Sequence, residues 1–185
     1  VLSYVWRVPV FSHANTIVRS ALGGWEISGI TMAQAGGPLT ILAGLDRSSS
    51  GIGSDKAQLV SQDIYKSGPC ANVAPCVNYL NSAACAQPDP GTFGNMAKGT
   101  LRGPGMFNTD AAVHKNFPVK ERVTLQFRAE YFNLFNHSNF INPFNSTAAG
   151  YTDGSRGASL NAPGFGTLKA ARDPRIGQLA LKIIF

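Results

Sequence analysis

The feature that most constrains this chain is a strict alternation of apolar and polar residues. The clearest example is the stretch "RVTLQFRAEYFNLF". Its apolar positions are Val123, Leu125, Phe127, Ala129 and Tyr131, and the polar positions between them are Thr124, Gln126, Arg128 and Glu130. Successive side chains of a β-strand point to opposite faces, so this period of two predicts a strand with one apolar and one polar face.

The same alternation occurs in four further stretches. They are residues 1–10, 24–36, 107–117 and 175–185. Each stretch is about ten residues long, which is the length of a tilted strand that crosses a bilayer. The pattern therefore predicts about five amphipathic strands.

The connections between these stretches differ sharply in length. We expect long loops at about residues 44–105 and 136–174, a tight turn at "PVKE" (Pro118 to Glu121) and a shorter link at "FSHANTIVRSALGG". A membrane barrel alternates short turns with long loops, whereas loops this long are uncommon in a compact soluble domain. The expected fold is all-β: an antiparallel meander of about five strands with two long loops, forming part of a larger transmembrane β-barrel.

Composition is consistent with strands joined by polar turns. Charged residues are 14% of the chain, against roughly 25% in soluble domains, and hydrophobic residues are 44%. The net charge of +6 comes from basic residues that are scattered singly, so nucleic-acid binding is not expected. No run of roughly 20 apolar residues and no signal sequence is present, and the start without Met suggests a segment of something longer.

Aromatic residues lie near the ends of the expected strands, where the interfacial girdles of a membrane barrel would place them. They are Tyr4, Trp6, Trp25, Phe107, Phe117, Tyr131, Phe132 and Phe135. For any one of them, a place in the core of a β-sandwich is the alternative. Lys115 falls on an apolar face, and near a membrane rim its amine is expected to snorkel to water.

The three cysteines, Cys70, Cys76 and Cys85, lie in one loop-like stretch. They lack C-x-x-C spacing and a nearby His, so a zinc site is not expected. A single disulfide in an oxidising compartment is the better interpretation, with one thiol left over. The sequence leaves the pairing open.

No group of residues points clearly to catalysis, for which a hydrolase needs a nucleophile, a base and an orienting acid. Asp110 and His114 share a strand face but are about 13 Å apart, too far for a hydrogen bond. His13 lies in the short link and His137 at the start of a loop, and neither a G-x-S-x-G nor a P-loop motif occurs. We expect no catalytic, cofactor-binding or metal-binding residues.

Asparagine recurs at every third position from Asn133 to Asn145, interleaved with phenylalanine. Alternating amides and aromatic rings would suit a carbohydrate-binding platform. We favour a wet rim in which Asn caps turns and Phe anchors the membrane interface.

Three longer segments resemble one protein family. They are "LGGWEISGITMAQAGGPLTI", "PGTFGNMAKGTLRGPGMFNTDAAVHKNFPVKERVTLQFRAEYFNLFNHSNFINP" and "PGFGTLKAARDPRIGQLALKIIF". Together they look like the C-terminal barrel portion of TonB-dependent outer-membrane receptors, closest to the Oar-like group with a carboxypeptidase-regulatory-like domain that is common in Acidobacteria. The similarity runs in order through nearly all of residues 1–185.

The resemblance implies a barrel-wall segment in the bacterial outer membrane, within a transporter that imports a large nutrient. Its partners would be the remainder of the barrel, the plug, the outer-membrane assembly machinery and lipid, and the plug and TonB-contacting regions do not occur in this sequence. Arg128 and Glu130, which alternate with lipid-facing positions, would face the lumen. The alternating final strand resembles the family's assembly signal, carried by Leu179, Leu181, Ile183 and Phe185.

Five strands cannot close a barrel of about 22 strands, so the chain is expected to be a fragment or to close as a homo-oligomer. Two other functions stay open at this point. One is a small standalone hydrolase recovered from environmental DNA. The other is a β-structure that assembles with copies of itself through exposed strand edges.

Overall fold

The computed structural model describes residues 1–9, 15–51, 53–70, 76–120, 123–143, 158–162 and 164–185. The chain divides into two compact units. The first comprises residues 1–34, 106–138 and 173–185, and the second comprises residues 35–105 and 139–172.

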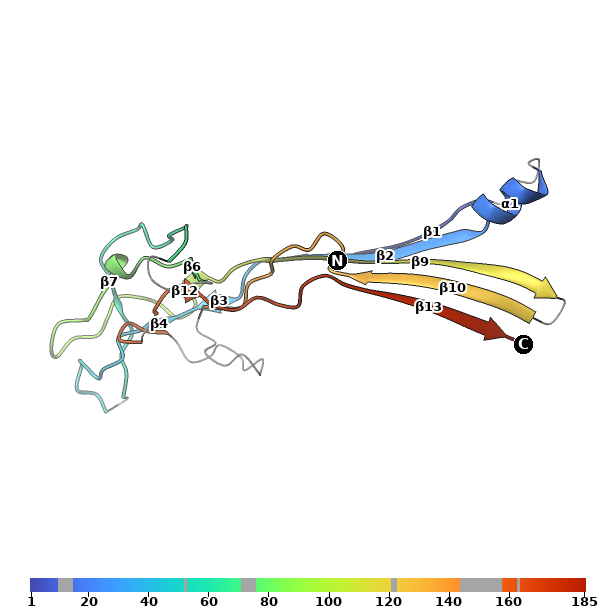
Figure 1. The fold of residues 1–185 in the computed structure, drawn as a ribbon. Helices are drawn as coiled ribbons and strands as arrows, with labels where there is room; N and C mark the ends of the chain where they lie inside the picture. The colour runs from blue at the N-terminus through green and yellow to red at the C-terminus, as the bar shows by residue number, and fades with distance from the viewer. Residues whose placement is uncertain (10–14, 52, 71–75, 121–122, 144–157, 163) are drawn as a thin grey trace. The chain divides into compact units, whose positions relative to one another are not determined.

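The first unit is a five-stranded sheet. Its strands are β1 (Leu2–Arg7), β2 (Trp25–Gln34), β9 (Met106–Lys120), β10 (Val123–Phe132) and β13 (Ile176–Ile184). They lie side by side in the order β1-β2-β9-β10-β13, and each pairs antiparallel with its neighbour (Figure 1). The prediction of an all-β antiparallel meander with five amphipathic strands is therefore confirmed.

The turn between β9 and β10 differs in position from the prediction. Pro118 pairs with Thr124 and Lys120 pairs with Val123, so the segment from Pro118 to Lys120 belongs to β9. The register shifts between Val123 and Thr124, which is the mark of a bulge. The residues between the two strands, 121–122, lie outside the described residues.

The link between β1 and β2 contains a helix that the alternation pattern did not predict. Helix α1 (Thr16–Leu22) begins after Asn15, whose side chain accepts a hydrogen bond from the Val18 backbone N–H at 2.9 Å. It ends at Gly23, whose N–H donates to the Arg19 carbonyl. An Asn before the first turn and a Gly after the last turn satisfy backbone groups that a helix leaves unpaired at its ends.

The second unit is built from very short elements. Its strands are β3 (Pro38–Leu39), β4 (Ile41–Leu42), β5 (Gln58–Leu59), β6 (Val77–Asn78), β7 (Cys85–Ala86), β8 (Leu101–Arg102), β11 (Ala158–Ser159) and β12 (Thr167–Leu168). They form four two-stranded ladders, of which β4 with β11 is parallel. A 3-10 turn, η1 (Ser82–Ala84), precedes β7.

These short elements surround a hydrophobic core. Its buried members are Leu39, Ile41, Ala57, Ile64, Leu80, Ala84, Cys85, Met96 and Leu101. Among the described residues, every buried hydrophobic side chain belongs to the second unit. The large apolar side chains of the sheet are exposed or half-buried, which is the reverse of what a soluble β-sandwich requires.

Candidate functional site

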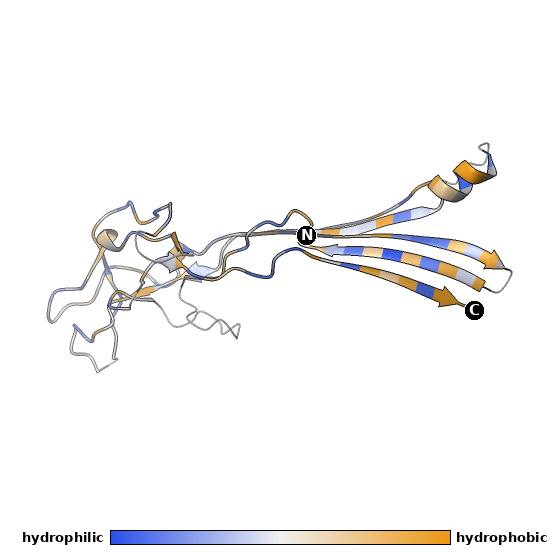
Figure 2. Ribbon diagram, viewed as in Figure 1, coloured by the Kyte–Doolittle hydropathy of each residue, from blue (hydrophilic) through white to orange (hydrophobic). Residues whose placement is uncertain are grey.

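The strand register sorts the sheet into two chemically different faces. Residues directly opposite each other in an antiparallel pair point to the same side, so the pairings identify each face. The apolar face carries Tyr4, Trp6, Trp25, Ile27, Val113, Phe117, Leu125, Phe127, Tyr131, Leu179, Leu181 and Ile183. The polar face carries Arg7, Glu26, Ser28, Asp110, His114, Asn116, Gln126, Arg128, Glu130, Gln178 and Lys182, together with a few apolar residues such as Val5. Figure 2 shows the resulting change between hydrophilic and hydrophobic residues along the strands.

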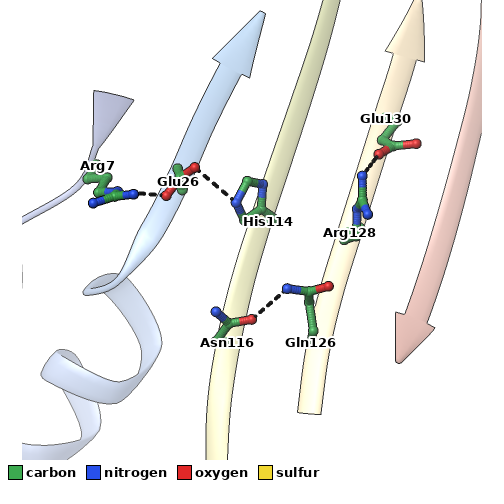
Figure 3. A network of polar contacts seen from close by, with 7 residues as sticks. All are labelled: Arg7, Glu26, His114, Asn116, Gln126, Arg128 and Glu130. Atoms are coloured by element: carbon green, nitrogen blue, oxygen red, sulfur yellow. Dashed lines mark hydrogen bonds and ion pairs between the residues drawn. The ribbon is translucent and has the colours of Figure 1, made fainter. Parts of the chain in front are cut away.

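One half of the polar face is a chain of polar contacts across three strands. The Arg7 Nε donates to Glu26 Oε2 at 2.8 Å, and the other oxygen of Glu26 lies 3.1 Å from His114 Nε2 (Figure 3). These residues follow each other in the register, since Arg7 pairs with Glu26 and Glu26 pairs with His114. The contact between Glu26 and His114 gives His114 a role as a cross-strand partner.

The other half of the polar face joins β9, β10 and β13. Arg128 bonds to Glu130 on its own strand, and Gln178 donates to the same carboxylate from β13. Gln126 Nε2 donates to Asn116 Oδ1 at 2.9 Å (Figure 3). The structure therefore places Arg128 and Glu130 together on the polar face. With Arg7 and Glu26 they form two balanced pairs of opposite charge.

Lys115 is the charged residue of the apolar face, and it does not reach water. It is 3% exposed, and its Nζ donates to the Ala21 carbonyl of α1 at 2.9 Å. The same amine lies 5.1 Å from the centre of the Trp25 ring and 4.9 Å from that of Phe117. The expected snorkelling is therefore wrong, because a helix carbonyl and two aromatic rings receive the cation inside the structure.

Two of the repeated asparagines have structural roles at the end of β10. Asn133 is buried with a positive φ of 50°, and its side chain exchanges hydrogen bonds with the backbone N–H and carbonyl of His137, both at 3.0 Å. Asn136 has a φ of 51° and accepts a bond from the Arg175 N–H. Asn is one of the few residues that adopts this backbone conformation readily, so the favoured interpretation of turn capping fits both positions. Asn145 lies outside the described residues.

The final strand β13 presents a row of exposed apolar side chains. Leu179, Leu181 and Ile183 are 60–71% exposed, and Phe185 after them is 95% exposed. In the described sheet β13 pairs on one side only, with β10. Its other edge therefore carries unpaired backbone groups.

The cysteines lie in the second unit. Cys70 and Cys76 form a disulfide with their Cα atoms 5.5 Å apart, and Cys85 is a free, buried thiol. Burial raises the pKa of the Cys85 thiol, which lowers its reactivity. No cluster of three or more potential metal-ligating residues occurs within the described part of the chain. In the same part, no helix is long and apolar enough to cross a membrane.

Comparison with protein families gave one finding. A family model described as an outer membrane beta barrel domain matches residues 1–178. Neither the curated proteins nor the solved structures gave a match.

Proposed function

Because this chain belongs to the outer membrane beta barrel domain family, we propose that it forms wall strands of a TonB-dependent receptor that imports a large nutrient. Membership of the family places the chain in the bacterial outer membrane, in contact with lipid. The finer assignment to TonB-dependent import of the Oar-like kind rests on the sequence resemblance. Nutrient import gives these residues a structural task and requires no catalytic group from them.

The observation that carries the wall function is the exposure of the apolar face. Lipid has to cover these side chains, because contiguous apolar surface of this extent is unfavourable in water. Phe107 and Phe117 both belong to this face of β9 and are ten positions apart, about 33 Å along a strand. A strand tilt of about 40° reduces that distance to about 25 Å, the height of the apolar band of an outer-membrane barrel.

The polar face is proposed to look into the lumen, with Arg128 and Glu130 among its residues. The balanced pairs of Arg and Glu let charged side chains line an interior without a large net field. Such a surface suits contact with water and with the polar surface of a plug. The unpaired edges of β1 and β13 are proposed to pair with further wall strands, since a sheet edge cannot remain open in lipid.

Leu179, Leu181, Ile183 and Phe185 are proposed to form the assembly signal. Their support is the alternation itself: Leu179, Leu181 and Ile183 of β13 and the following Phe185 are apolar and exposed, and the outer edge of β13 is free in the described sheet. A recognition protein can pair with such an edge and read its side chains in the same contact. The partners proposed for the chain are this machinery, the rest of the barrel, a plug and lipid.

The import proposal is tested in cells that express the whole receptor. Growth on a panel of large nutrients, such as oligosaccharides and iron chelates, is compared between wild-type cells, receptor-deleted cells and cells without TonB. The proposal predicts a nutrient whose use needs both the receptor and TonB. A nutrient that needs the receptor but not TonB would show a passive barrel and contradict the import mechanism.

A further inference from the structure

Helix α1 exposes apolar side chains that nothing in the described chain covers. Ile17 is 79% exposed, Leu22 is 57% exposed and Val18 is 37% exposed. In a helix with 3.6 residues per turn, positions 17, 18, 21 and 22 lie along one side, and position 19 lies away from them. The helix therefore has an apolar side, formed by Ile17, Val18, Ala21 and Leu22. Arg19 lies outside this apolar side.

The helix is bonded to the apolar face of the sheet. The Ala21 carbonyl accepts two hydrogen bonds of 2.9 Å, one from Trp25 Nε1 and one from Lys115 Nζ. Both donors belong to the apolar face. A helix of seven residues is not stable by itself in water, so these bonds to its last turn are needed to hold it in place.

The position of helix α1 along the strands of the sheet is also defined. Helix α1 connects β1 to β2 at the end of the sheet where β9 turns into β10 (Figure 1). In outer-membrane barrels the short connections lie on the periplasmic side. Helix α1, which is bonded to two residues of the apolar face, is thus expected at the periplasmic boundary of the membrane.

We propose that α1 is an interfacial anchor that binds phospholipid of the periplasmic leaflet. Ile17, Val18 and Leu22 enter the region between headgroups and acyl chains, as the apolar residues of other surface-lying amphipathic helices do. Arg19 stays at headgroup level. Lys115 donates its hydrogen bond to the Ala21 carbonyl from the protein side. This bond holds the lipid-binding helix α1 against the sheet. This inference rests on the proposed membrane-wall function.

The test measures how deeply single labelled positions enter the bilayer. Cysteine is introduced as Ile17→Cys, Arg19→Cys or Leu181→Cys in a Cys85→Ser background of the whole receptor, and each is labelled with a polarity-sensitive fluorophore. Ile17, Arg19 and Leu181 are all exposed, so the labels do not disturb the core. The receptor is inserted into vesicles of phosphatidylethanolamine and phosphatidylglycerol. Quenching by acyl-chain spin labels is compared with quenching by aqueous iodide.

The proposal predicts several-fold stronger acyl-chain quenching at position 17 than at position 19, approaching that at position 181. Strong iodide quenching at position 17 would show that the helix lies in water and would overturn the proposal. Protection of position 17 from both quenchers would show that protein covers it, and would overturn the proposal equally. In both of these cases lipid quenching at position 181 would leave the wall function standing, whereas its loss would refute the wall function as well.

Discussion

Gly29 is a position in the sheet at which an added side chain would clash with its neighbours. A Cβ built on it would lie 2.7 Å from the backbone carbonyl oxygen of Asp110 and would also meet the ring of Tyr4, its partner on β1. Backbone of a neighbouring strand cannot move aside without disturbing the ladder. An aromatic side chain that covers a glycine in this way also replaces the packing that the glycine lacks.

We expect Gly29→Ala to destabilise the inserted protein by about 1–3 kcal/mol, the usual cost of overpacking. The measurement is urea unfolding in vesicles, followed by tryptophan fluorescence. Gly37→Ala is the matched control, because its added Cβ meets nothing within 4 Å. Equal unfolding midpoints for the two variants would contradict the close packing at Gly29.

Asp46 organises a loop of the second unit in a pH-dependent way. Its carboxylate accepts hydrogen bonds from the Ser50 and Gly51 backbone N–H groups at 3.1 and 2.7 Å. The Gly51 bond is the main cause that lowers the pKa of Asp46 below its ordinary value of 3.8. A lowered folded-state pKa means that the carboxylate stabilises the loop above the ordinary value, and that this contribution is lost as the pH falls through the folded value.

We therefore expect Asp46→Ala to speed amide hydrogen exchange at Ser50 and Gly51 at neutral pH. As the pH falls from the ordinary Asp value through the lowered folded-state pKa, the difference from wild type should narrow, because the wild-type carboxylate then becomes protonated. Mass-spectrometric or NMR exchange measurements at several pH values check this. If the difference in exchange rate between Asp46→Ala and wild type stays constant into acid, the hydrogen bonds to Asp46 do not depend on the charge of its carboxylate.

Single residues also show where sequence reasoning stops. Alternation assigned Arg128 and Glu130 to a polar side, because facing is a local property of a strand. It did not pair Glu26 with His114, since that contact depends on the register between β2 and β9. The expectation that the Lys115 amine reaches water was also wrong, because the carbonyl that it bonds belongs to a helix 94 positions away in the sequence.

At the scale of elements, long strands were predictable and short elements were not. The five sheet strands contain six to fifteen residues, long enough for a period of two to repeat. The two-residue strands of the second unit have no period to detect, so the sequence indicated only long loops there. Helix α1 has only seven residues. The sequence indicates it only through its capping residues, Asn15 before it and Gly23 after it.

Strand β13 provides the element-scale prediction. We expect Phe185→Ala to reduce the amount of folded receptor in the outer membrane several-fold, because it removes one apolar side chain of the proposed assembly signal. Ile184→Ala is the control, since Ile184 pairs with Thr124 on the polar face and lies outside the signal. Folded and unfolded receptor are separated by heat-dependent migration in gels. Equal losses for both variants would mean that the strand end is needed only for packing.

At the scale of the whole molecule, the described sheet is a wall with two open edges. Strands β1 and β13 each have one partner in it, and one face carries a row of apolar side chains that are exposed or half-buried. Both facts have the same explanation in a membrane barrel, where further strands cover the edges and lipid covers the face. The sheet and its membership of an outer-membrane barrel were predictable from the sequence. The second unit's core was not, because its residues come together from segments far apart in the chain.

In the proposed barrel, lipid covers one face of this sheet and an aqueous lumen meets the other. The most direct test places spin labels on neighbouring positions of two strands, at Gln126 and Phe127 on β10 and at Leu181 and Lys182 on β13, in the membrane-inserted receptor. Accessibility to oxygen, which enriches in lipid, is compared with accessibility to a water-soluble nickel complex. Oxygen accessibility should be high at Phe127 and Leu181, and the nickel complex should reach Gln126 and Lys182. If labels at adjacent positions show the same environment on both strands, the sheet does not separate lipid from lumen, and the wall function is wrong.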